Sequence, residues 1–64
     1  MILKFKAPLG LIIGATVGFV DIPGRTGWVG RCGTIITRIQ KTPGRAAGQL
    51  RKAMKRAGFE EVES

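Results

Sequence analysis

A chain of 64 residues has room for one small domain, and its 44% hydrophobic content excludes a compositionally disordered protein. Eleven lysines and arginines stand against four acidic residues, and a net charge of +7 attracts polyanions and repels copies of the chain. With no histidine, no tyrosine and one cysteine, the sequence excludes an intramolecular disulfide and a cysteine metal cluster, and it predicts neither catalysis nor a bound cofactor.

The single cysteine, Cys32, favours a reducing compartment, and the sequence shows no convincing secretory signal. We expect Cys32 to be a small core residue in a strand, because the chain has no histidine to activate it as a nucleophile. The expected location is therefore the cytoplasm or a viral or ribonucleoprotein particle.

Two strands are predicted first, over residues 2–6 and 9–20. The run from Ala7 to Val20 has fourteen uncharged residues, whereas a helix needs about 20 to span a membrane. Its residues alternate instead. A bulky face holds Leu9, Leu11, Ile13, Ala15, Val17 and Phe19, and the other face is rich in glycine. An interfacial membrane segment is the alternative for this run.

The dipeptide Pro23-Gly24 predicts a type II turn that exposes Arg25. Residues 28–40 then predict one long strand, in which recurring glycines mark a bulge or a sharp coil. A phosphate-binding glycine loop is the alternative, although the Lys-Ser/Thr pair of a P-loop is missing.

Residues 43–57 predict a helix, with Thr42 as N-cap, Pro43 as first residue and Gly58 after the last turn. Its apolar positions recur at helical spacing and form one face, which holds Ala46, Ala47, Leu50, Ala53, Met54 and Ala57. Residues 59–64 form an acidic tail or a short edge strand.

The opposite face of this helix is basic throughout and holds Arg45, Arg51, Lys52, Lys55 and Arg56. Like charges four residues apart repel by about 0.2–0.5 kcal/mol per pair, as Arg51 with Lys55 and Lys52 with Arg56 do. Because these pairs cost stability, we expect this face to bind a negatively charged partner.

The segment Val17 to Ile39, VGFVDIPGRTGWVGRCGTIITRI, resembles the KOW-type motif of small SH3-like barrels. Val17, Phe19, Gly24, Gly30, Gly33, Ile35 and Ile36 take the places of the motif's glycines and hydrophobic residues. The resemblance implies a small barrel that contacts RNA or a ribonucleoprotein. The very apolar strand before the loop and the C-terminal helix depart from the family's pattern.

The sequence therefore predicts one α+β domain over residues 1–64. It consists of a small, strongly bent β-sheet or an SH3-like barrel, with three to four strands, followed by one C-terminal amphipathic helix. The predicted function is a non-enzymatic module that binds nucleic-acid phosphates largely without sequence preference. Its predicted binding residues are Arg25, Trp28, Arg31, Arg38, Lys41, Arg45, Arg51, Lys52, Lys55 and Arg56.

Two other functions remain open. A domain this small buries only about 60% of its unfolded surface, which suits an oligomer or a structural subunit of a virion or ribonucleoprotein. The same cations would also suit an adaptor or inhibitor that docks on an acidic protein surface.

Overall fold

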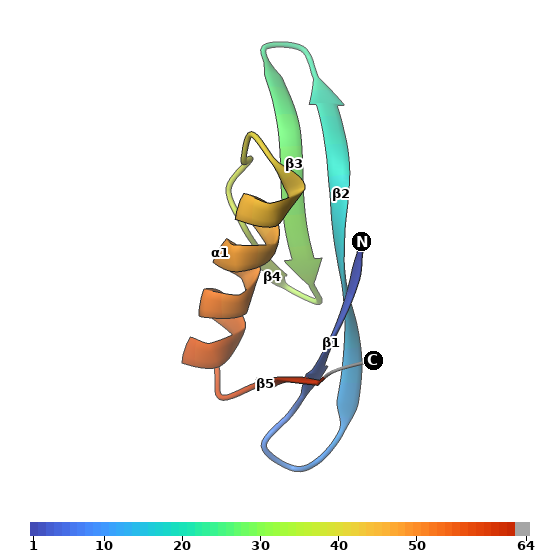
Figure 1. The fold of residues 1–64 in the computed structure, drawn as a ribbon, viewed down its shortest axis with the longest axis vertical. Helices are drawn as coiled ribbons and strands as arrows, with labels where there is room; N and C mark the ends of the chain where they lie inside the picture. Colours follow the sequence, from blue (N-terminus) through green and yellow to red (C-terminus); the bar gives the residue numbers. More distant parts are fainter. Residues whose placement is uncertain (63–64) are drawn as a thin grey trace.

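The fold is a single antiparallel sheet with one helix against one of its faces (Figure 1), and the computed structural model describes residues 1–62. Along the chain the elements are β1 (Ile2–Lys6), β2 (Ile12–Ile22), β3 (Arg25–Cys32), β4 (Ile35–Ile36), α1 (Pro43–Arg56) and β5 (Glu60–Val62). The strands lie in the order β4-β3-β2-β1-β5. The α+β class is confirmed, with five strands where three to four were predicted.

The sheet is open, so the SH3-like barrel is wrong. Closing a barrel requires the two edge strands to pair with each other. Here the edges are β4 and β5, of two and three residues, and the three longer strands separate them. The helix covers the face that a barrel would enclose.

Strand β1 has the predicted bounds, but β2 begins at Ile12 and not at residue 9, and it continues to Ile22, beyond the predicted end at residue 20. A turn precedes it, in which the Gly10 amide donates to the Ala7 carbonyl (2.8 Å) and the Ala7 amide donates to the Leu11 carbonyl (2.7 Å). Gly10 has a φ of 96°, which a glycine adopts without strain. Leu9 therefore lies in a loop.

A two-residue turn at Pro23-Gly24 joins β2 to β3, since Ile22 and Arg25 are partners in the ladder. The φ of 79° at Gly24 is the one that a type II turn requires, as predicted. The resulting hairpin projects past the N-terminal end of α1 (Figure 1).

The predicted strand over residues 28–40 is two segments, and the first begins at Arg25, three residues before the predicted start. Strand β3 ends at Cys32, and Gly33, with a φ of 60°, begins a two-residue turn into β4. The chain then returns along β3, where Trp28 and Gln40 exchange backbone hydrogen bonds of 2.7 and 2.8 Å. The turn exists because glycine adopts this left-handed conformation without steric cost.

Helix α1 ends at Arg56, one residue before the predicted end, and both ends are capped as the sequence predicts. The Thr42 hydroxyl accepts from the Arg45 amide (3.2 Å). After the C-cap, the Gly58 amide donates to the Lys55 carbonyl (3.0 Å) and the Phe59 amide to the Met54 carbonyl (2.9 Å), a Schellman motif.

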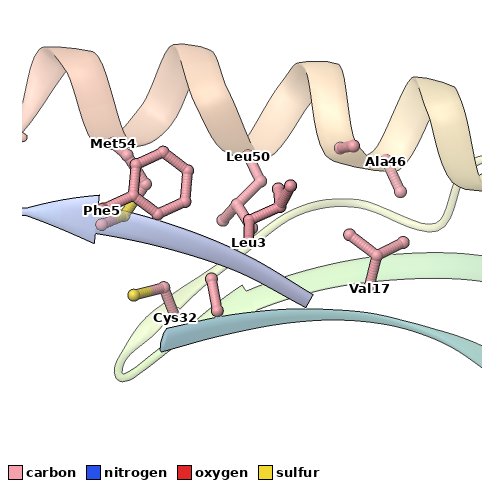
Figure 2. Packing of buried hydrophobic residues seen from close by; sticks show 9 residues of the cluster. Leu3, Phe5, Val17, Cys32, Ala46, Leu50 and Met54 are labelled. Carbon is pink, nitrogen blue, oxygen red and sulfur yellow. The ribbon is translucent and has the colours of Figure 1, made fainter. Parts of the chain in front are cut away.

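The core lies between α1 and one face of the sheet. In Figure 2, Met54 lies over Phe5, Leu50 over Leu3 and Ala46 over Val17. The buried residues are Leu3, Phe5, Ala15, Val17, Cys32, Ala46, Ala47, Leu50 and Met54. The core position expected for Cys32 is therefore confirmed.

Two predicted apolar faces are only partly buried. The helix covers the middle of β2 and buries Ala15 and Val17. Phe19, farther along β2, and Leu9 and Leu11, in the loop before β2, lie beyond the region that the helix covers and are exposed. On the helix Ala53 is half-buried, and Ala57 is exposed because it follows the last turn.

The sheet face away from the helix has isoleucines at its surface. Cross-strand partners lie on the same face, so Ile2, Thr16, Arg31 and Ile36 form one row across four strands. Ile2, Ile12, Ile22 and Ile36 are each at least half exposed. This surface is hereafter called the open face.

Of the predicted tail over residues 59–64, Glu60–Val62 form β5, and residues 63 and 64 lie outside the described residues. Within residues 1–62, no helix has the length and apolar character needed to cross a membrane.

Gly30 brings the helix close to β3. A Cβ atom at this position would lie 3.0 Å from Leu50 Cβ and 3.1 Å from the Ala46 carbonyl oxygen. A side chain would therefore push the helix off the sheet.

We predict that Gly30→Val lowers the free energy of unfolding by about 1–3 kcal/mol, the usual cost of overpacking a core. Urea unfolding followed by Trp28 fluorescence measures it. Gly18→Val is the matched control, since no atom lies within 4 Å of a Cβ there. Equal stability of the two variants would contradict the close approach.

Candidate functional site

The predicted binding residues lie on three separate surfaces of the protein. Nine of the ten are exposed, and Trp28 is half-buried. The surfaces are the side of α1 that faces β4, the side of α1 that faces β5, and the open face.

The first surface begins at the edge of β3, where Arg25 and Arg38 line one hollow of about 510 Å³ together with Thr37 and Ile39. Arg25 is the cross-strand partner of Ile22, so this end of the hollow borders the open face. The hollow forms because the chain after β4 returns along β3. Gly27 permits this return, since a Cβ there would collide with the Gln40 carbonyl oxygen. Two arginines that are distant in the sequence therefore share one concave site.

A second hollow, of about 420 Å³, joins this edge to the helix. Arg38 and Thr37 line it too, and its other lining residues are Ile36, Gln40, Gln49 and Ala53. Among the described residues, no carboxylate lines either hollow.

The helix continues this surface. Gln49 has Arg45 four residues before it and Lys52 three residues after it, and Arg56 lies three residues beyond Ala53, so these side chains are neighbours. We call the continuous surface the cationic strip, which consists of Arg25, Arg38, Gln40, Arg45, Gln49, Lys52 and Arg56. Lys41 is exposed between Gln40 and the helix N-cap.

Acidic residues of β5 flank the other side of the helix. Arg51 Nε lies 2.7 Å from Glu61 Oε1, in a pair whose side chains are 46% and 38% exposed. Such an exposed pair adds at most about 1 kcal/mol of stability. Lys55 lines a hollow with Arg51, Glu60 and Glu61. The basic face predicted for the helix is therefore divided, and Arg51 and Lys55 lie on its charge-compensated side.

Arg31 does not join either group of cations. It lies on the open face between Thr16 and Ile36, with the sheet between it and the helix. The structure thus separates Arg31 from the helix residues with which the sequence grouped it.

Trp28 packs against the core and makes an edge-to-face contact with Phe19, with ring centroids 5.5 Å apart at 69°. Phe19 is 59% exposed, so it is the more accessible aromatic ring. This pair was not predicted from the sequence. The signal was the Pro23-Gly24 turn, because a two-residue turn there makes residues 19 and 28 cross-strand partners.

Metal binding and thiol chemistry have little support among the described residues. Among residues 1–62, no group of three or more histidine, cysteine, aspartate or glutamate side chains is arranged to hold a metal ion. The buried Cys32 thiol donates only a long hydrogen bond, of 3.7 Å, to the Gly14 carbonyl.

Comparison with protein-family models, curated proteins and solved structures gives no match. The RNA or ribonucleoprotein contact that the KOW-type motif implied therefore stays a prediction. The barrel that the motif implied is not formed.

We predict that Lys52→Glu raises the free energy of unfolding by about 0.4–1 kcal/mol, because it replaces a repulsion with Arg56 by an attraction. Urea unfolding at low ionic strength measures the change. Lys52→Gln, which only removes the repulsion, should give about half the effect. A loss of stability in Lys52→Glu would show that the cationic strip contributes to folding.

Proposed function

We propose that this protein is a non-enzymatic module that binds nucleic-acid phosphates through the cationic strip, largely without sequence preference. The observation that carries the proposal is the continuity of the strip. Arg25 and Arg38 line the first hollow, and Arg38 and Gln49 line the second, which shares Thr37 and Arg38 with the first. On the helix Arg45, Lys52 and Arg56 are neighbours of Gln49 and Ala53, and no carboxylate among the described residues lines either hollow. Such a surface attracts a polyanion more strongly than dispersed charges do.

The dimensions of the strip suit a nucleic-acid backbone. From Arg45 to Arg56 the helix rises about 16 Å, at about 1.5 Å per residue. One strand of B-DNA presents a phosphate about every 3.4 Å along its axis. Arg45, Lys52 and Arg56 can therefore each reach a different phosphate, while Arg25 and Arg38 extend the contact beyond the helix.

The side chains of the cationic strip suit contacts to the nucleic-acid backbone better than recognition of base edges. Arginine, lysine and glutamine side chains donate hydrogen bonds to phosphate oxygens, and these contacts carry no direct sequence information. Trp28, the one aromatic residue among the predicted binding residues, is half-buried against the core and so offers little of its ring to a base. Weak sequence preference and strong salt dependence are therefore expected.

An adaptor that docks on an acidic protein surface would use the same cations. That alternative predicts no measurable affinity for nucleic acid at any salt concentration. Duplex DNA of random sequence and single-stranded RNA are therefore both needed as probes.

We predict that replacing Arg38, Lys52 and Arg56 together by Gln lowers duplex affinity at low salt by roughly tenfold or more. The slope of log affinity against log salt should also fall by about 0.9 for each phosphate that the variant no longer neutralises. Fluorescence anisotropy with labelled duplex at several NaCl concentrations measures both quantities.

The matched control replaces Lys4, Lys6 and Arg31 by Gln, which removes three charges from the open face. This control should bind nearly as the unchanged protein does. If both triple variants lose the same affinity, net charge and not the strip determines binding. Affinity that does not change with salt would contradict the phosphate mechanism.

A further inference from the structure

The loop between β1 and β2 exposes large apolar side chains at one end of the molecule. Leu9 is 99% exposed and Leu11 is 67% exposed, and next to them Ile12 is 55% exposed. The loop lies at the opposite end of β2 from the Pro23-Gly24 turn (Figure 1). These leucines contribute nothing to the core, so the fold does not explain them.

Backbone hydrogen bonds hold the loop in the conformation that exposes Leu9. The backbone hydrogen bonds from Gly10 to Ala7 and from Ala7 to Leu11 close it into a tight turn. Leu9 stands in this turn with almost its whole side chain exposed to solvent. A leucine that stays in water lacks the favourable free energy of burial, so a partner that covers Leu9 would gain much of that free energy.

Lysines stand beside the apolar tip. Lys6 is the cross-strand partner of Ile12, and Lys4 is the partner of Gly14, and both lysines are exposed. Glu60 is the other partner of Lys6 and is the one described carboxylate in this row. The end of the molecule therefore combines a protruding apolar tip with a positive rim.

We propose that this end of the protein docks on the surface of an anionic lipid bilayer. Leu9 and Leu11 would enter the boundary between headgroups and acyl chains, while Lys4 and Lys6 contact anionic headgroups. Apolar side chains combined with cations are the recurring means of interfacial binding.

A lipid surface suits these observations better than a protein does. From Ala7 to Ile13 no side chain is polar, whereas protein interfaces carry about one hydrogen bond per 100–200 Å². Leu9 protrudes with 99% of its surface exposed, so a protein partner would need a matching pocket, while a bilayer receives a protruding side chain directly. A second copy of the chain would bring Lys4 and Lys6 against the same lysines.

The proposal does not depend on nucleic-acid binding. The cationic strip lies on α1 and the edge of β3, and the loop belongs to β1 and β2. Variants in the two regions therefore separate the two activities.

The test is flotation of the full chain with vesicles of phosphatidylcholine alone, and with vesicles that contain about one third phosphatidylserine. We expect binding to the anionic vesicles only. Leu9→Ser should lower partitioning by roughly tenfold or more. Lys4→Gln and Lys6→Gln, each tested as a single variant, should each lower partitioning by roughly fivefold. Leu9→Ser should leave DNA affinity unchanged.

Ile22→Ser is the matched control, since Ile22 is 50% exposed at the end of β2 that lies away from this loop. It should partition as the unchanged protein does. A second measurement uses Leu9→Trp, whose added emission should shift to the blue on anionic vesicles, whereas that of Ile22→Trp should not.

Three results would overturn the proposal. The first is no partitioning to anionic vesicles, which would leave a protein as the occupant. The second is equal partitioning of Leu9→Ser and the unchanged protein. The third is binding that disappears only on replacing Arg45, Lys52 and Arg56, which would assign the lipid contact to the cationic strip.

Discussion

The contact between α1 and β3 at Gly30 sets the arrangement of every other surface. Because no side chain separates them, Leu50 and Ala46 lie directly on the strand. The buried residues all lie between the helix and this face of the sheet. A 14-residue helix that buries Ala46, Ala47, Leu50 and Met54 must turn its charged residues outward. The helix position thus determines which cations reach solvent and which strands flank them.

The two flanks of the helix differ in charge, and this difference defines the candidate site. On one flank β5 brings Glu61 beside Arg51, and Lys55 lines the same hollow. On the other flank the segment after β4 brings Arg38 beside Gln49, and no described carboxylate lines that hollow. The helix thus has one compensated side and one uncompensated side. A polyanion would gain most from the second, because no internal carboxylate competes for its cations.

Local signals in the sequence predicted most of the elements, and long-range contacts explain the errors. The cap at Thr42, the glycine at Gly58 and the Pro23-Gly24 turn act over a few residues, so the helix, to within one residue, and the turn were correctly predicted. The turn at Gly33 was mistaken for a bulge, because glycine in a strand suits either. The outward helix cations were also identified. The hollow between Arg25 and Arg38 and the pairing of Arg51 with Glu61 depend on contacts across the sheet, which periodicity does not encode.

The most direct test of the central claim is a ¹H–¹⁵N NMR titration of the protein with a short DNA duplex at low salt. We expect the amide shifts to concentrate in residues 37–40, near Arg25, and on the β4-facing and outward sides of α1. Residues of β1 and the Arg31 region of the open face should change little. Shifts centred on Lys4, Lys6 and Arg31, or spread evenly over the chain, would contradict the claim that the cationic strip is the binding surface.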